Sequence, residues 1–184
     1  MSEELLVRHC SPTLAGLKTG NLFSYNVESI ALLKNKIKYM NKMLNSKGVY
    51  VCLLKLFGNR ALIYVFRPSK LKMDLDRDEA RALLSKAGYS GESSLYEYIR
   101  HLSERIDKGS EFPHEIGLFL GYPIEDIKGF IANKGKNCKC VGCWKVYNNE
   151  GEAKKIFAKY KKCTDIYCKK LNEGLSIMRL TIVA

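Results

Sequence analysis

The stretch that decides the predicted fold is YVCLLKLFGNRALIYVF, residues 50–66. Its two arms, Tyr50–Phe57 and Arg60–Phe66, are rich in β-branched and aromatic residues, and the Gly58-Asn59 pair between them suits a two-residue turn. Apart from Lys55 and the terminal Arg60, both arms are apolar on both faces, which is typical of strands with helices on each side. We therefore predict a β-hairpin whose arms are central strands of a sheet.

The segment before the hairpin contains an amphipathic helix. Asn26 is a suitable N-cap, and Gly48 is a suitable stop. Between them, apolar residues recur at steps of three and four: Ile30, Leu33, Ile37, Met40 and Leu44. Residues 8–20 are instead rich in small and turn-forming residues, so we predict a loop there, followed by a short strand at Asn21–Tyr25.

Further helices and two short strands are predicted after the hairpin. Capping-box spacings, Asp76 with Glu79 and Ser94 with Glu97, begin two helices, which stop at Gly88 and at Gly109. The other expected elements are helices opened by Pro113 and by Pro123, a long helix from Gly151 to about Leu171, and strands at Cys143–Tyr147 and Ile177–Val183. This order predicts an α+β fold, in which several helices pack on a small mixed or antiparallel sheet in a single domain, residues 1–184. A separate basic, cysteine-containing C-terminal subdomain, residues 135–184, is the alternative.

Composition narrows the class of protein. A chain of 184 residues is long enough to form a core without a disulfide or a metal. It begins with the acidic MSEELLV and has no apolar run that could cross a bilayer, so we expect a cytoplasmic protein without a membrane partner. Its seven cysteines would then stay reduced, as ligands, nucleophiles or core residues.

The positive charge of the chain is concentrated in one segment. The net charge is +12, and residues 128–170 hold twelve lysines against three acidic residues, a balance of +9. Such a segment could bind nucleic acid or an acidic protein, although lysines without arginines are more typical of a solvated surface. It gives the alternative function, a basic binding module without enzymatic activity.

A cysteine triplet gives the first candidate site. Cys138, Cys140 and Cys143 lie within six residues, a spacing that can hold Zn or Fe if a fourth ligand joins them. Cys163, Cys168, His114 and Cys10 are the candidates for that ligand. The same residues also permit dithiol redox chemistry at Cys140 and Cys143, and free thiols in a lysine-rich loop are the third interpretation.

Two distant segments give a second candidate site. His9 and Cys10 would have to meet His114 and Glu115, either as a nucleophile with its base or as ligands of a transition metal. If the segments stay apart, a core role for Cys10 and a local hydrogen bond for His114 are expected. Enzymatic activity is left open.

The loop Ser11–Asn21 has the hydroxyls, the glycines and the lysine, Lys18, that an anion-binding loop needs. Neither Gly16 nor Gly20 is followed by the Lys-Ser/Thr pair of a phosphate-binding loop. We therefore interpret this segment as an ordinary loop.

Three longer motifs resemble one family. HCSPTLAGLKTGNLF, FPHEIGLFLGYPIEDIKGFI and GCWKVY are together similar to the signatures of a bacterial family catalogued as domain of unknown function 3793. The resemblance covers nearly the whole chain and includes His9, Cys10, His114 and Glu115. It implies a link to iron or redox physiology and no particular activity. It also implies that an aromatic residue is frequent at position 143, so that a metal site with Cys143 would not be general to the family.

Overall fold

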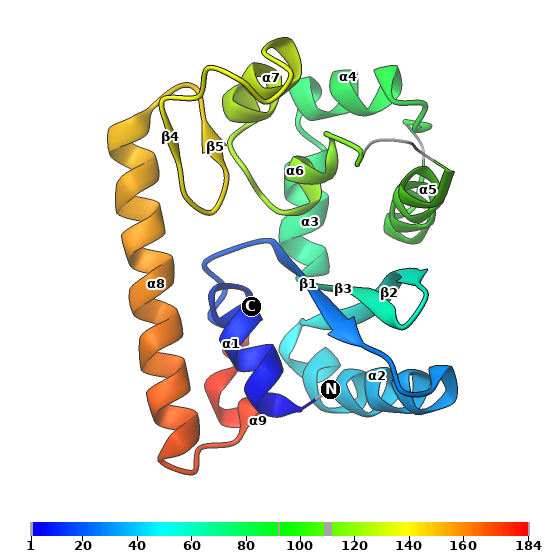
Figure 1. Ribbon diagram of the computed structural model, residues 1–184, viewed down its shortest axis with the longest axis vertical. Helices are drawn as coiled ribbons and strands as arrows, with labels where there is room; N and C mark the ends of the chain where they lie inside the picture. Colours follow the sequence, from blue (N-terminus) through cyan, green and yellow to red (C-terminus); the bar gives the residue numbers. More distant parts are fainter. Residues whose placement is uncertain (1, 92, 109–111, 184) are drawn as a thin grey trace.

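The centre of the computed structural model is a three-stranded antiparallel sheet with helices on both faces (Figure 1). The structure describes residues 2–91, 93–108 and 112–183. The strands are β1 Gly20–Asn26, β2 Tyr50–Phe57 and β3 Arg60–Phe66, in the order β1-β3-β2. The hairpin is confirmed with the predicted bounds, but only its second arm is central, because β1 pairs with β3 and leaves β2 at an edge.

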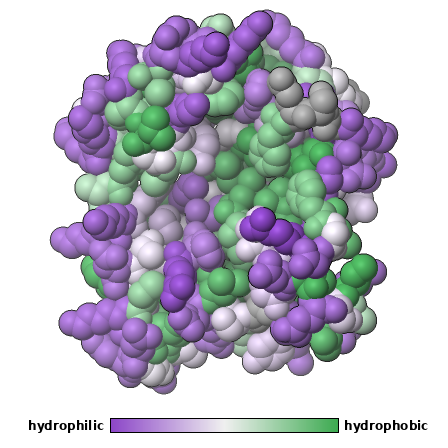
Figure 2. All heavy atoms as spheres, viewed as in Figure 1, coloured by the Kyte–Doolittle hydropathy of each residue, from purple (hydrophilic) through white to green (hydrophobic). Residues whose placement is uncertain are grey.

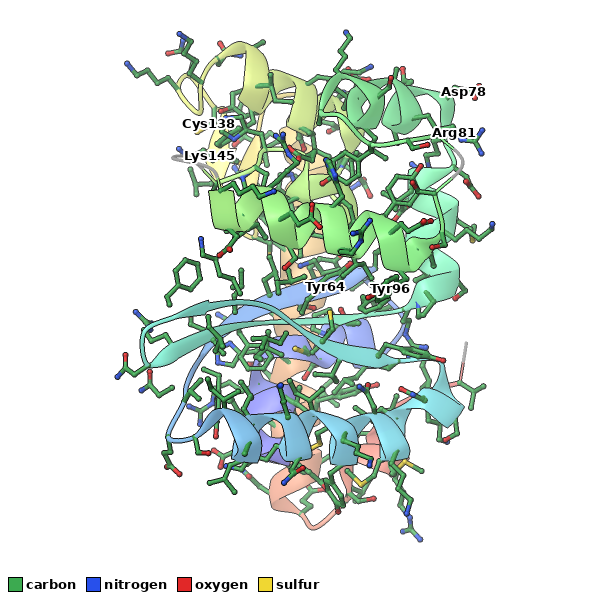
Figure 3. The ribbon with its side chains drawn as sticks, turned by 90° about the vertical axis from the view of Figure 1, so that its right-hand side faces the viewer. Tyr64, Asp78, Arg81, Tyr96, Cys138 and Lys145 are labelled. Carbon is green, nitrogen blue, oxygen red and sulfur yellow. The ribbon has the colours of Figure 1, made fainter. Side chains whose placement is uncertain are left out.

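The central strand β3 explains why helices cover both faces. Ala61, Ile63 and Val65 belong to one buried cluster, whereas Tyr64 and Phe66 belong to a second one. Successive side chains of a strand point to opposite faces, so an apolar strand needs an apolar layer on each side. Figure 3 shows these layers, with the hairpin between α2 and α5. The predicted α+β class is confirmed.

Helices α1 Glu3–Leu14, α2 Ile30–Leu44 and α9 Ile177–Leu180 cover the first face, and the short 3-10 helix η1 Asn45–Lys47 follows α2. The predicted helix in residues 30–44 is confirmed, although Ser29 and not Asn26 caps it. The predicted strand at residues 177–183 is wrong, because residues 177–180 form α9. Its Ile177 and Leu180 pack in the same core as α1, where Thr181 N donates to Ile177 O and closes the helical turn.

The loop predicted for residues 8–20 begins instead as a helix. Ser2 caps α1 by accepting from Leu5 N, and Leu6, Val7, Cys10 and Leu14 form its buried face. Pro12 lies in the last turn, where its carbonyl accepts from Leu17 N and Lys18 N. These bonds turn the chain back after the helix, so only residues 15–19 are a loop.

The second face of the sheet is covered by α3 Pro68–Leu75, α4 Asp78–Lys86, α5 Leu95–Lys108, α6 Ile116–Phe119 and α7 Ile124–Ala132. The capping box of α5 is confirmed, since Ser94 N donates to Glu97 and Glu97 N donates to Ser94. Gly109, its expected stop, lies outside the described residues. The box expected at Asp76 is wrong: Asp76 ends α3 and accepts from Arg81.

The remaining elements lie along one side of the molecule. A small hairpin, β4 Cys140–Val141 and β5 Lys145–Val146, precedes the long helix α8 Glu150–Asn172. Figure 1 shows α8 beside α1, and Figure 2 shows hydrophilic side chains along that edge. Tyr167 and Leu171 of α8 pack against the α1 core. Within the described residues, no helix combines the length and the apolar character that crossing a membrane requires.

Candidate functional site

A hollow of about 460 Å³, which we call the Lys18 pocket, lies where α1, β1 and α8 meet the loop after α6 and the turn between β4 and β5. Its size falls within the range of small-molecule sites. Its walls come from segments that are distant in sequence: His9, Pro12, Lys18, Asn21, Leu22, Leu120, Tyr122, Cys143, Phe157, Tyr160, Lys161, Thr164 and Asp165. Each of the three motifs quoted above contributes to it.

Lys18 is the unusual member of this lining. Only 6% of the residue is exposed. Within the described residues its Nζ makes no hydrogen bond and no ion pair, and it lies 5.2 Å from the centre of the Tyr122 ring. Burial lowers the pKa of Lys18 to about 8, against the opposing influence of the Cys143 and Cys10 sulfurs. The amine is therefore still mainly protonated at pH 7, without an acidic partner in the described part of the chain.

A close approach of two loops holds Tyr122 against Lys18. Gly121 has φ +69°, and a Cβ at this position would lie 2.5 Å from Thr19 Oγ1. Only glycine lets the chain pass so near Thr19, whose hydroxyl also donates to Asp74 Oδ2 at 2.5 Å. Beyond Gly121, Tyr122 N donates to Gly117 O and its hydroxyl donates to Cys143 O at 3.0 Å. The ring is thus fixed between Lys18 and the turn that carries Cys143.

Cys143 brings an exposed thiol to the mouth of the pocket. Burial raises the pKa of this thiol, while the nearby Lys18 ammonium lowers it. Burial also raises the pKa values of Tyr122 and Tyr160 to about 12, so both phenols are protonated at neutral pH. The pocket thus holds the buried Lys18 cation, one thiol and neutral hydroxyls, and α8 adds the opposite charges of Lys161 and Asp165 at its rim.

Two polar residues complete the wall on the side of α1 and β1. His9 stacks on Phe23, with ring centres 5.1 Å apart, and partial burial lowers the pKa of His9. Asn21 Oδ1 accepts from Thr13 Oγ1 at 2.7 Å. The amide nitrogen of Asn21 makes no hydrogen bond within the described residues, so it can donate to a ligand.

The structure does not bring the predicted catalytic residues together. Cys10 is fully buried in the core between α1 and the sheet, where burial raises its pKa. Glu115 lies on the other face of the sheet and accepts from Arg105 and from the Tyr89 hydroxyl. His114 contacts Phe130 at the edge of a separate cavity. The contacts of Cys10 and Glu115 are thus those of residues that stabilise the fold.

The predicted metal ligands do not converge either. Cys138 and Cys140 are partly buried near β4, and Cys140 packs with Trp144, whereas Cys143 faces Lys18. His9 lines the same pocket as Cys143. In residues 2–91, 93–108 and 112–183 there is no group of three His, Cys, Asp or Glu side chains that could hold a metal ion. The hairpin separates the triplet along the chain, because Cys138 precedes β4, Cys140 lies in β4 and Cys143 lies in the turn between β4 and β5.

The burial of Lys18 is not evident from the sequence. The loop had the composition of an anion-binding segment, but it lacks a phosphate-loop pattern. Burial of Lys18 depends on Tyr122 and α8, which follow it by more than a hundred residues. The available signal was a lysine between two glycines within a long motif, and it pointed to the correct segment.

Comparison with known proteins identifies the family without adding an activity. No curated protein and no solved structure matches the chain. A family model described as "Protein of unknown function (DUF3793)" matches residues 6–181, which is nearly the entire sequence. The chain therefore belongs to the DUF3793 family.

Proposed function

We propose that the protein binds a small organic anion in the Lys18 pocket. The observation that carries this proposal is the buried ammonium of Lys18, which has no acidic partner in the described residues. A buried charge without a partner is unfavourable, and perturbed lysines in clefts are frequent at functional sites. A carboxylate or phosphate of a ligand would provide the missing partner.

The rest of the lining indicates what such a ligand looks like. The side chains of Tyr122, Phe157 and Tyr160 form aromatic walls, which suit the carbon skeleton of an organic molecule. The Asn21 amide can donate to its polar groups, and the Thr164 hydroxyl, which itself donates to Tyr160 O at 3.1 Å, can accept from them. Lys161 and Asp165 at the rim carry opposite charges. The pocket is thus suited to a small organic acid or phosphate ester.

Thiol chemistry at Cys143 is a second proposal for the same pocket, and the sulfur's position beside Lys18 favours it. The thiolate is the reactive form, and the ammonium stabilises it. A bound anion would compete with the thiolate for Lys18. The bound-metal interpretation receives no comparable support, because the described residues hold no suitable ligand group.

The basic-module alternative has a different origin. On α8, Lys159, Lys161, Lys162 and Lys169 are exposed and form no ion pair within the described residues. Lys154 and Lys155 are each paired with a glutamate of the same helix, and Lys170 is paired with Glu173, the C-cap residue of α8. A nucleic acid would have to bind through the first group, and its retention should fall steeply with salt. Absence of retention at low salt would remove nucleic acid as a partner.

The leading proposal is tested by thermal unfolding with succinate and with inorganic phosphate as probes. We expect one of these anions to raise the melting temperature of the wild type in a saturable way, since a ligand at about 100 times its Kd stabilises by about 2.7 kcal/mol. Lys18→Met keeps the apolar stem but should abolish this response. Lys159→Met removes an equal charge outside the pocket and should preserve it. Equal responses of the two variants would contradict the proposal.

A further inference from the structure

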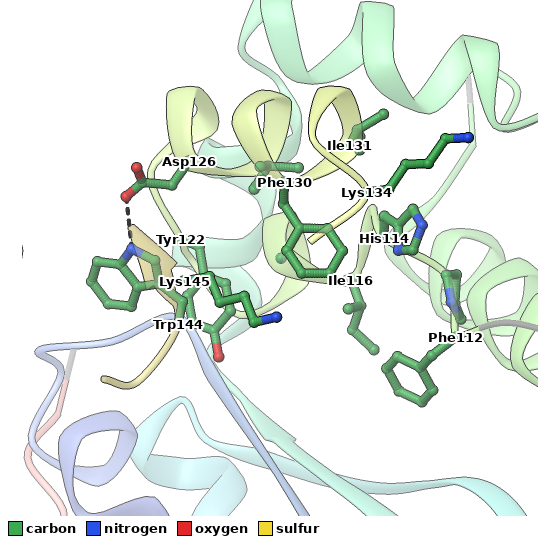
Figure 4. A pocket seen from close by; sticks show the side chains of 13 residues that line it. Phe112, His114, Ile116, Tyr122, Asp126, Phe130, Ile131, Lys134, Trp144 and Lys145 are labelled. Atoms are coloured by element: carbon green, nitrogen blue, oxygen red, sulfur yellow. Dashed lines mark hydrogen bonds between the residues drawn. The ribbon is translucent and has the colours of Figure 1, made fainter. Parts of the chain in front are cut away.

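A second cavity, of about 830 Å³, lies between α6, α7 and the β4–β5 hairpin (Figure 4). We call it the Trp144 cavity. Ile116, Ile127, Phe130 and Trp144 give it an apolar lining. Its volume is that of a site for a small molecule with a sizeable apolar body. Phe112 and Ile131 at its edge are 48% and 40% exposed, so a ligand would remove their apolar surface from water.

Hydrogen bonds fix the position of the Trp144 indole in the cavity wall. Trp144 Nε1 donates to Asp126 Oδ2 at 2.7 Å, and the other carboxylate oxygen accepts from Tyr147 N and Asn148 N at 2.8 and 2.9 Å. The Tyr122 ring packs 5.0 Å from the indole on the same wall. These contacts fix the indole, so the cavity does not depend on a mobile side chain.

The charges around the cavity are predominantly positive. Lys145 Nζ donates to Gly135 O at 2.8 Å and lies 5.7 Å from the centre of the Phe130 ring, which places an ammonium beside the apolar lining (Figure 4). Lys134 lies at the rim, next to His114. Asp126 is the one acidic residue in the described lining, and its carboxylate already accepts three hydrogen bonds, from Trp144 Nε1, Tyr147 N and Asn148 N. An apolar space with ammonium groups at its edge is complementary to an amphipathic acid.

We propose that the Trp144 cavity binds an amphipathic carboxylic acid, with its apolar body against Ile116, Phe130 and Trp144 and its carboxylate near Lys145. This site is distinct from the Lys18 pocket, although Tyr122 contributes to both linings. The proposal does not depend on Lys18 or on Cys143. Lys18→Met should therefore bind the acid as the wild type does, which separates the two proposals experimentally.

The single tryptophan of the chain provides the measurement. We would titrate the protein with monomeric dodecanoate and with dodecanol, an uncharged analogue, and follow the fluorescence of Trp144. We expect a saturable change with both probes and tighter binding of dodecanoate. Absence of saturable dodecanoate binding, checked by equilibrium dialysis, would overturn the proposal. Equal affinities would overturn the part that concerns the carboxylate.

Matched variants locate the site. Ile131→Glu places a charge at the cavity edge. The control, Ile166→Glu, places the same charge on α8, outside the cavity lining, at an isoleucine that is similarly exposed, at 47%. We expect Ile131→Glu to weaken binding of both probes by about tenfold or more, since it puts an ionised group into the apolar site. Ile166→Glu should have no effect. Equal binding by these two variants would place the ligand elsewhere and contradict the proposal.

A lysine pair tests the charge and does not depend on the folding of Ile131→Glu. Lys145→Met and Lys139→Met each remove one ammonium that donates to a backbone carbonyl in the same hairpin region, but Lys139 does not line the cavity. We expect Lys145→Met to weaken dodecanoate binding by about threefold to fivefold and to leave dodecanol unchanged. Lys139→Met should change neither. An equal loss for both lysine variants would contradict the assignment of Lys145.

Discussion

Two cations are buried near the end of α1, and their surroundings are opposite. Arg67 is fully buried, and its guanidinium donates to Thr13 O, Leu14 O, Lys47 O and Ile182 O at 2.6 to 3.1 Å. Lys18 is almost as buried, but within the described residues its ammonium has a ring beside it and no hydrogen-bond acceptor. The fold thus gives one buried charge four acceptors and the other none within the described residues.

The difference lies in what each charge does for the chain. Arg67 joins α1, η1 and the C-terminal segment, because a planar guanidinium can serve several carbonyls at once. The carbonyls at the end of a helix carry partial negative charge, so a cation there stabilises α1. Among the residues that the structure describes, Lys18 joins no segments in this way. We infer that Arg67 maintains the structure, whereas Lys18 is retained for a ligand.

The largest expected effect is that of Arg67→Met. It would remove one donor from each of four carbonyls, of which Thr13 O and Leu14 O keep a backbone donor, and breaking a buried charged network typically costs about 3–5 kcal/mol. We expect a loss of this size in the free energy of unfolding, measured by urea denaturation. Arg100→Met, which removes an exposed ion pair with Glu104, is the control and should cost less than about 1 kcal/mol. A loss below about 1 kcal/mol for Arg67→Met would remove the contrast with Lys18.

The second prediction is that removal of the other buried cation, Lys18, raises the free energy of unfolding. The pKa of Lys18 falls from 10.5 to about 8 on folding. Below pH 8, keeping Lys18 charged in the folded state therefore lowers the free energy of unfolding by about 3 kcal/mol. Between pH 8 and 10.5 the unfolded chain binds more protons, and this destabilisation is relieved as the pH rises. Lys18→Met should therefore be more stable than the wild type at pH 7, by at most this amount, and the difference should shrink towards pH 10. A less stable variant at pH 7 would indicate that Lys18 has a structural partner.

How far the sequence predicts the fold depends on whether the determinants are local. The β2–β3 hairpin and the box of Ser94 and Glu97 were predicted because turn and cap are set by neighbouring residues. Helix α1 was missed because the small and turn-forming residues of segment 8–20 suggested a loop, whereas Arg67, more than fifty residues away, binds the carbonyls at the end of the helix. The α9 segment was missed for a similar reason, since apolar residues 177–180 fit either a strand or a helical turn packed on α1.

The candidate site was less predictable than the fold. Residue types pointed to cysteines and histidines, yet burial and pairing decide which of them are available. Cys10 was a reasonable nucleophile by type, and the core encloses it. Lys18 was set aside because its loop lacks a phosphate-loop pattern, and burial without a partner in the described residues makes it unusual. Only Cys143 and His9 of the predicted residues line the pocket that Lys18 occupies.

The third prediction uses Lys18 to direct a reagent to Cys143. Iodoacetate is an anion, so Lys18 should speed its reaction with Cys143 relative to that of neutral iodoacetamide. We expect Lys18→Met to lower the ratio of the two rates by about threefold to tenfold, since one nearby charge contributes about 1 kcal/mol in this setting. Peptide mass spectrometry after partial labelling identifies the sulfur. Cys10 is the internal control, because its burial should prevent labelling until the protein unfolds.

If the ratio is unchanged in Lys18→Met, the ammonium does not act on the thiol, and the thiol proposal for this pocket fails. If Cys10 reacts as early as Cys143 in the folded protein, the burial that distinguishes them is not present in solution. Either result would alter the contrast between the enclosed core and the open pocket.

The smallest expected effect on stability is that of the Tyr122 ring, which lies beside the Lys18 ammonium. Tyr122→Phe keeps the ring and loses the hydroxyl bond to Cys143 O, whereas Tyr122→Leu also loses the ring. A buried cation gains about 1 kcal/mol from an aromatic face, so the leucine variant should lower stability further than the phenylalanine variant does. That additional loss should be smaller in the Lys18→Met background, because methionine has no charge that could interact with the ring. A double-mutant cycle measures this coupling, and a value near zero would mean that the ring only packs against the lysine stem. Coupling of the expected size would instead show that the fold offers Lys18 enough stabilisation to stay charged and far less than the four carbonyls provide to Arg67.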